Sequence, residues 1–269
     1  MSAFANHFAF EFKTGLRNPT LLLMNYLFPL GFYAMMGLVM TQINPLFVGV
    51  IIPAMVIVAV MASNLLGLPG PLVESREAGI YRSFKINGVP ALAILATPML
   101  TTVFHALIVS VIIVLTAPLF FGGEPPGNWG AFALVTLVSA LAFGAIGALI
   151  GVVAKEERAT VFLSQAIFLP SMLLSGLMMP LSMLPAAVTR FAALLPTTHA
   201  MQAFEGLAFG RETVLDPGLS LLILASSGVL AFLLAVYLFS WDSRNATRRG
   251  HPLLGLLALV PYVIAFLLG

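Results

Sequence analysis

The chain has 269 residues, of which 60% are hydrophobic and only 8% are charged, and its mean hydropathy is +1.06. A soluble domain cannot bury that much apolar surface, so most of the chain must lie in lipid rather than in water. The net charge is only +2, and the absence of cysteine excludes disulfide bonds and thiolate metal sites.

The first predicted element is an amphipathic helix over residues 2–18. Apolar side chains recur at every fourth residue from Phe4 to Leu16, while charged side chains lie elsewhere around the helix. This pattern is typical of a helix that lies in the membrane interface. We expect it to end before Pro19, where the first span begins. A purely topogenic anchor is the alternative interpretation.

Six apolar runs follow, each long enough to cross about 30 Å of hydrocarbon as a helix, which takes about 20 residues. Membrane strands would be shorter and would alternate in polarity, so these runs predict helices. The third run is too long for a perpendicular crossing, and Pro98 is expected to mark a cytoplasmic overhang or a kink. The runs cover residues 21–40, 46–68, 91–121, 131–154, 159–179 and 218–240.

The basic residues predict how these spans are oriented. If the N-terminus is cytoplasmic, only Arg190 and Arg211 of the 12 lysines and arginines fall on the outer side. Cytoplasmic loops of membrane proteins carry such an excess of basic residues. We therefore expect a multi-pass protein of the cell's cytoplasmic membrane, surrounded by the lipid bilayer, with its N-terminus inside.

Two further apolar segments lie outside the six runs. Residues 180–217 are too apolar for a solvated loop, and prolines divide them into short pieces. Short helices that dip into the outer leaflet or pack over the ends of the spans are expected there. Residues 252–269 are apolar throughout but few, and Pro261 interrupts them. They could form a short seventh span or a helix embedded in the inner leaflet.

The fourth run carries glycines on successive helical turns. Gly144, Gly147 and Gly151 would let another helix approach closely. Packing within the chain is the favoured interpretation, and a seam between two copies is the alternative.

Ionisable residues are almost absent from the six runs, which hold no Asp, Glu, Lys or Arg. Because coupling ions and protons bind such residues in secondary transporters, ion-coupled transport is disfavoured. His105 does lie within a run, and a hydrogen bond to a neighbouring helix is favoured over a functional role. Asn25, Asn64 and Gln165 are interpreted in the same way, with lining of a transport pathway as the alternative.

The sequence lacks the motifs of an enzyme. No lysine follows a glycine, so the chain has no phosphate-binding loop and any ATP must bind to another polypeptide. Glu156 and Glu157 superficially resemble an intramembrane protease motif, but Val161 stands where that motif needs arginine. A zinc motif of the H-E-x-x-H type is absent too. We therefore expect a non-catalytic protein.

Residues 74–90, ESREAGIYRSFKINGVP, concentrate scarce charge between two spans, and we call them the polar loop. They mix charged residues with Tyr81, Phe84 and Ile86 in a loop of helix size, and we expect this loop to contact something in water. A solvated loop that only fixes the topology is the alternative.

Three segments of the chain resemble ABC-2 type permeases, the membrane-spanning subunits of ABC exporters. In the polar loop, Arg76, Glu77 and Gly79 match the family pattern R-E-x-G-T, with Ile80 in place of threonine. Residues 10–19, FEFKTGLRNP, resemble the family's N-terminal interfacial helix. Residues 175–185, SGLMMPLSMLP, and the leucine-proline pair after them resemble the signature that precedes the last span.

The resemblance implies an all-α polytopic fold with six ABC-2 type transmembrane helices in residues 1–249. The apolar segment at 250–269 is an addition to the usual six-span plan. The resemblance further implies the permease subunit of an ATP-driven exporter, which pairs with a second permease as a homo- or heterodimer. Two copies of a separate ABC ATPase would bind ATP and Mg²⁺, whereas this chain would hold no cofactor and bind no nucleic acid. An ion-coupled transporter or channel without an ATPase is the alternative.

The resemblance also assigns candidate site residues. The polar loop would be the coupling helix that docks in the ATPase, through Glu74, Arg76, Glu77, Gly79, Tyr81, Arg82, Phe84 and Lys85. A pathway for a hydrophobic or amphiphilic, drug- or lipid-like substrate would be lined by Asn25, Phe28, Met35, Asn64, His105, Gln165 and Met172.

Overall fold

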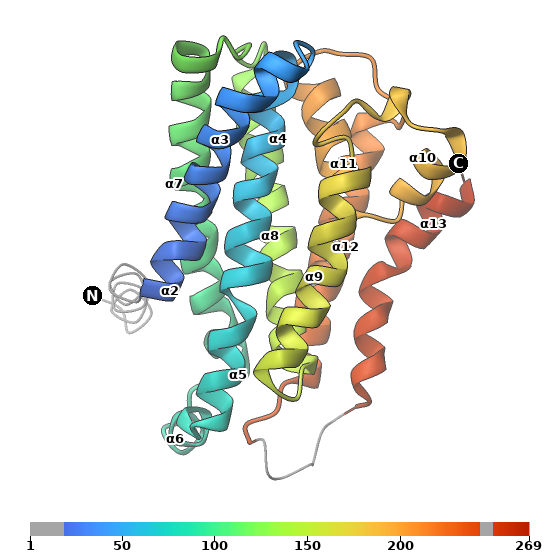
Figure 1. Cartoon of the computed structure of the whole chain (residues 1–269). Helices are drawn as coiled ribbons and strands as arrows, with labels where there is room; N and C mark the ends of the chain where they lie inside the picture. Colours follow the sequence, from blue (N-terminus) through green and yellow to red (C-terminus); the bar gives the residue numbers. More distant parts are fainter. Residues whose placement is uncertain (1–18, 243–249, 269) are drawn as a thin grey trace.

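The computed structural model describes residues 19–242 and 250–268, and these residues form helices and no strand. The predicted interfacial helix at 2–18 and the arginines at 244, 248 and 249 lie outside this part of the chain. Long helices run side by side through the molecule, with α6 at one end and α10 near the other (Figure 1). Five of the described helices are long and apolar enough to cross a membrane, so the chain is an all-α polytopic membrane protein.

The first two spans each contain a local irregularity. Short π-helical turns, η1 and η2, interrupt the first and second spans, and the second span continues into α5 beyond the apolar run. The elements are α2 (Pro19–Leu22), η1 (Leu23–Leu27), α3 (Phe28–Ile43), α4 (Phe47–Met61), η2 (Ala62–Gly67), α5 (Pro69–Glu77), α6 (Ile80–Ile86) and α7 (Ala91–Phe121). Helix α7 has the predicted bounds and runs uninterrupted through Pro98 and Pro118.

The remaining long helices are α8 (Trp129–Val153), α9 (Glu157–Leu174) and α12 (Pro217–Leu238). Helix α9, predicted to be the fifth span, has 18 residues but is not among the five helices apolar enough to cross a membrane, because it begins with Glu157 and Arg158. It also ends earlier than the predicted residue 179. Gly176 has a φ of +89°, a left-handed conformation that breaks the helix and that glycine adopts without steric cost.

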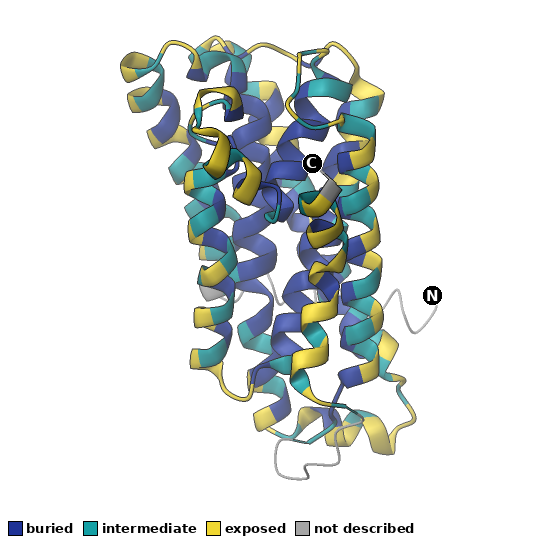
Figure 2. Ribbon diagram, turned by 90° about the vertical axis from the view of Figure 1, so that its right-hand side faces the viewer, coloured by how far each residue is buried: buried dark blue, intermediate teal, exposed yellow. Residues whose placement is uncertain are grey.

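Helix α4 forms the centre of the bundle, and its residues from Val50 to Met61 are all buried. Buried residues likewise concentrate on the inner helices, while exposed residues lie around the outside (Figure 2). Helix α8 approaches the second span closely at its glycines. A Cβ atom added at Gly147 would lie 2.1 Å from the carbonyl oxygen of Asn64. Packing within the chain is thus confirmed for this glycine face, and the predicted alternative, a seam between two copies, is wrong.

Residues 180–217, which we call the outer segment after the side of the membrane predicted for them, form short helices, as predicted. They are η3 (Leu181–Met183), α10 (Ala186–Ala192), α11 (Pro196–Ala203) and η4 (Phe204–Ala208). Pro180 and Pro185 directly precede η3 and α10, and Pro196 is the first residue of α11. Proline suits these positions because its fixed φ fits a helix start and its missing N–H is not needed there. Every residue of α11 is buried, so this helix packs among the spans.

The tail rises along α12 from the end of the bundle that carries α6 toward the end that carries α10 (Figure 1). It comprises the 3-10 helix η5 (Pro252–Leu259) and α13 (Val260–Leu268), with Pro261 close to the change between them. A 3-10 helix rises about 2.0 Å per residue against 1.5 Å in an α-helix, so the two together extend about 30 Å. The Arg190 guanidinium lies 5.0 Å from the centre of the Phe266 ring, which places the end of α13 beside α10.

Candidate functional site: the polar loop and its surroundings

The polar loop folds as two helical pieces joined by a tight turn. Helix α5 ends where the amide of Ala78 donates to the Glu74 carbonyl, and Gly79 then adopts a φ of +76°. Gly79 is also the N-cap of α6, which has no side-chain cap. Ile80, the departure from the family pattern, is therefore simply the first residue of α6. Gly88, with a φ of +72°, ends the loop before α7.

Arg76 points into the membrane domain rather than into solvent. Its side chain is 3% exposed. Its guanidinium donates hydrogen bonds to the carbonyls of Gly151 (3.3 Å), Val152 (3.0 Å) and Ala154 at the end of α8. The last carbonyls of a helix lack partners within it and carry partial negative charge, so a buried arginine satisfies them well. Arg76 thus joins α5 to α8.

Tyr81 also faces inward. It is 5% exposed, and its ring lies 5.3 Å from that of Phe239 just after α12. Phe239 in turn makes an edge contact with Trp241 at 5.2 Å. Phe84 is half-buried against the same core. The aromatic residues of α6 therefore attach the polar loop to the last span.

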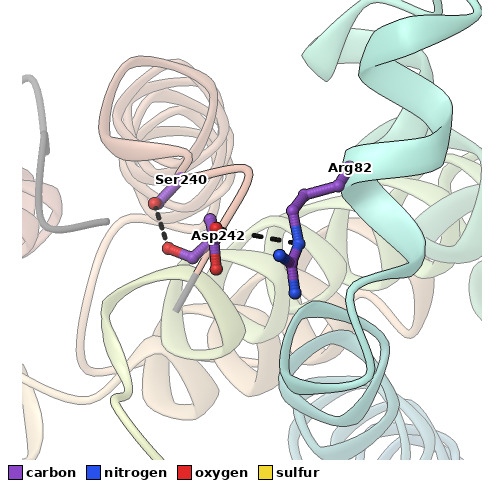
Figure 3. A network of polar contacts seen from close by, with 3 residues as sticks. All are labelled: Arg82, Ser240 and Asp242. Atoms are coloured by element: carbon purple, nitrogen blue, oxygen red, sulfur yellow. Dashed lines mark hydrogen bonds and ion pairs between the residues drawn. The ribbon is translucent and has the colours of Figure 1, made fainter. Parts of the chain in front are cut away.

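An ion pair reinforces this attachment. Arg82 Nε lies 3.7 Å from the carboxylate of Asp242, and the hydroxyl of Ser240 donates to the Asp242 backbone carbonyl at 2.8 Å (Figure 3). Sequence patterns did not single out Asp242, because it lies about 160 positions from Arg82 and only the fold brings the two residues together.

The solvent-facing side of the loop combines charge with one prominent apolar side chain. Glu74, Glu77 and Lys85 are exposed. Ile86, at the end of α6, is 87% exposed, and Ile80 is 45% exposed. The predicted coupling set is therefore divided between this outward surface and the inward contacts of Arg76 and Tyr81.

Two of the predicted pathway residues meet in one cavity of about 220 Å³ next to α6. Asn25 on η1 and His105 on α7 line it, together with Thr101 and Thr102, which sequence patterns did not single out. The hydroxyl of Tyr26 lies 2.6 Å from His105 Nδ1, so the predicted hydrogen bond to a neighbouring helix is confirmed.

The other pathway candidates are dispersed. Asn64 is buried against α8, and its side-chain amide donates a hydrogen bond to the Val60 carbonyl of its own span. The predicted hydrogen bond from Asn64 to a neighbouring helix is therefore wrong. The Phe28 ring lies 6.4 Å from that of Phe168 on α9. Gln165 and Met172 are half-buried on α9, and Met35 is exposed on α3.

A second polar cluster lies in the outer segment, around a cavity of about 460 Å³. Glu205 is nearly buried and accepts a hydrogen bond from Gln202 Nε2 at 3.1 Å. Burial raises the pKa of the Glu205 carboxyl, while nearby Arg211 and the Gln202 bond oppose this rise. Arg211 also donates to Glu124 at 2.6 Å. The sequence analysis did not single out Glu205, because its neighbours in the chain are mostly apolar and no motif marks it.

Comparison with known proteins agrees with this architecture. The chain is 27% identical over 233 residues to the "Putative transport permease YvfS" of Bacillus subtilis (strain 168), an alignment that covers 85% of this chain and 93% of the relative. No solved structure matches the chain significantly. The family described as ABC-2 family transporter protein matches residues 27–237. The chain therefore belongs to the ABC-2 family of transporters.

Proposed function

We propose that this permease is the membrane-spanning subunit of an ATP-driven exporter and that a separate ATPase docks on the outward surface of α6. The observation that carries the proposal is Ile86, an apolar side chain 87% exposed at the tip of a charged loop. An isolated apolar anchor within a polar rim is the usual composition of a docking site for a groove on a partner protein. The ATPase would bind ATP and Mg²⁺, and this chain would be non-catalytic.

The inward contacts of the polar loop support a mechanical role. Arg76 joins the loop to α8, while Tyr81 and Arg82 join it to the end of α12. A displacement of α6 would therefore reach the second, fourth and last spans together. Rigid helices that move as a unit are a common means of transmitting a conformational change.

The proposed topology places α6 and the N-terminus in the cytoplasm and the short helices α10 and α11 outside. The tail is then a seventh crossing, because its length of about 30 Å matches the hydrocarbon core and its end lies beside α10. The exposed apolar side chains of η1, α3 and α9, including Leu27, Leu38, Phe162 and Leu173, offer a face for a second permease subunit. A hydrophobic or amphiphilic substrate suits a pathway with few polar groups.

The docking proposal is tested by co-purification of the permease with its ATPase. Replacing Ile86 with serine should weaken binding about tenfold, since a buried isoleucine contributes about 1.5–3 kcal/mol. Val214→Ser is the matched control, because Val214 is 50% exposed in the outer segment. Wild-type affinity and ATP-dependent transport in Ile86→Ser would contradict the proposal. Transport that needs an ion gradient and no ATPase would favour the alternative of a secondary transporter.

A further inference from the structure

Two cavities follow one another along the groove between α7 and α12. The first, which we call the headgroup cavity, has a volume of about 790 Å³ and opens between α6, the start of α7 and the end of α12. Both charged and apolar side chains line it, and they include Arg82, Lys85, Asp242, Leu92, Val236 and Phe239.

The second cavity, which we call the acyl groove, has a volume of about 280 Å³ and is bounded by α7, α8 and α12. All its lining residues are apolar, among them Met99, Ala145, Ala225, Gly228 and Phe232. Helices α8 and α12 approach each other closely beside this cavity, since a Cβ atom added at Gly228 would lie 2.8 Å from the Cα of Ala142. The lipid-facing wall includes Leu233, which is 60% exposed.

The two cavities are aligned along the same pair of helices. On α12, Val236 of the headgroup cavity follows Leu233 of the acyl groove by one helical turn. On α7, Leu92 and Met99 are two turns apart, or about 10 Å. From Ser240 to Gly228 the path covers about 18 Å, which is close to the depth of one leaflet of a hydrocarbon core about 30 Å thick.

The charge of the headgroup cavity favours an anion. Arg82 and Lys85 face a single carboxylate, that of Asp242, which pairs with Arg82. Within the described parts of the chain, no hydrogen bond or ion pair engages the Lys85 ammonium group. Lysine is a common point-charge partner for phosphate. Trp241 lines the same cavity, and tryptophan is enriched at the headgroup level of membranes.

We propose that this groove binds one anionic glycerophospholipid of the inner leaflet, with its phosphate at Lys85 and Arg82 and one acyl chain in the acyl groove. The leaflet assignment rests on the proposed topology. Basic pockets between spans on the cytoplasmic side suit anionic headgroups. A free phosphate ion would leave the apolar wall and the acyl groove unfilled. The bound lipid would bridge α6, α7 and α12 and so strengthen the attachment of the polar loop to the last span.

The test titrates the purified full-length permease in detergent with dioleoylphosphatidylglycerol. Bound lipid is counted by native mass spectrometry, and the midpoint of thermal unfolding is recorded in parallel. We expect one saturable lipid and a rise in the midpoint. Dioleoylphosphatidylcholine should bind more weakly, dihexanoylphosphatidylglycerol should stabilise less because its chains cannot fill the acyl groove, and inorganic phosphate should have no effect.

Variants separate the two halves of the site. Lys85→Gln should weaken phosphatidylglycerol binding about fivefold, the contribution of one basic residue near an anionic surface. Its control, Lys155→Gln, removes an exposed lysine that does not line the cavity. Ala225→Phe should exclude the long acyl chain, whereas Leu222→Phe, on the lipid-facing side of the same helix, should not.

Equal stabilisation by inorganic phosphate would overturn the lipid as occupant. Equal loss of binding in Lys85→Gln and Lys155→Gln would overturn the site in favour of nonspecific attraction, and unchanged binding in both Lys85→Gln and Ala225→Phe would overturn it outright. Binding is measured without the ATPase, so a failure of the docking proposal leaves these outcomes unaffected.

Discussion

The buried guanidinium of Arg76 lies 3.0 Å from the carbonyl oxygen of Val152 and so fastens α5 to the last turn of α8. The polar loop therefore has an inward side that packs on the spans and an outward side that is exposed. Arg76 and Tyr81 hold the loop to the spans, and Ile86 faces outward among charged residues.

Replacing Arg76 should destabilise the permease itself. Removing the guanidinium leaves the buried α8 carbonyls without their donor, and an unsatisfied buried polar group commonly costs about 1–3 kcal/mol. Arg76→Gln should lower the unfolding midpoint in detergent even when no ATPase is present. Glu77→Gln changes an exposed neighbour and should leave the midpoint within error. A loss of ATPase binding at unchanged stability in Arg76→Gln would refute this assignment.

Gly147 should tolerate no side chain. An added Cβ atom would lie 2.1 Å from the Asn64 carbonyl oxygen, so the fourth and second spans would have to separate. Gly147→Ala should therefore cost about 1–3 kcal/mol, the usual cost of overpacking. Gly31→Ala is the control, because nothing lies within 4 Å of its added Cβ atom. Equal midpoints of thermal unfolding for Gly147→Ala and Gly31→Ala would contradict the observed packing.

The link between α6 and α12 should matter for transport more than for ATPase binding. Asp242→Asn removes the charge that pairs with Arg82 while keeping the side chain's size. Because half-exposed ion pairs contribute little to stability, folding should be nearly unchanged. We expect the ATPase to co-purify normally while transport per ATP hydrolysed falls, which reconstitution into vesicles would measure. Normal transport in this variant would show that the ion pair transmits no motion.

Glu205 should make stability depend on pH. Burial raises its pKa above the ordinary value of 4.5, so the folded protein keeps a proton that the unfolded chain has already lost. Stability should then fall as pH rises from about 4.5 to the higher folded-state pKa. In Glu205→Gln this fall in stability with pH should be absent. Unfolding midpoints of both proteins, recorded from pH 4.5 upward, would measure it. An identical pH profile in both proteins would argue against a raised pKa.

The tail can be placed by cysteine labelling, since the native chain has no cysteine to remove. Leu267→Cys, at the exposed end of α13, should react with a membrane-impermeant maleimide in intact cells, as Glu212→Cys should on the outer side. Lys155→Cys should react only after the membrane is opened. Protection of Leu267→Cys in intact cells would instead support a tail embedded in the inner leaflet.

Local chemistry made much of this fold predictable. The bounds of α7 follow from uninterrupted apolarity, and Pro180, Pro185 and Pro196 mark the starts of the outer helices. The sequence could not show which side chains of the polar loop face inward and which face outward. Arg76 faces inward because its hydrogen-bond partners lie at the end of α8, and only the fold brings that end close to α5. Contacts between distant segments, such as that of Arg82 with Asp242, leave no periodic signal in the sequence.

Site-specific photocrosslinking shows whether α6 contacts an ATPase through Ile86. Ile86→Cys, modified with a benzophenone maleimide in membrane vesicles that contain the cognate ATPase, should yield a crosslinked permease–ATPase band on illumination. The same probe at Val214→Cys should yield none. An ATPase that co-purifies with the permease but crosslinks at neither position would contradict a contact through Ile86.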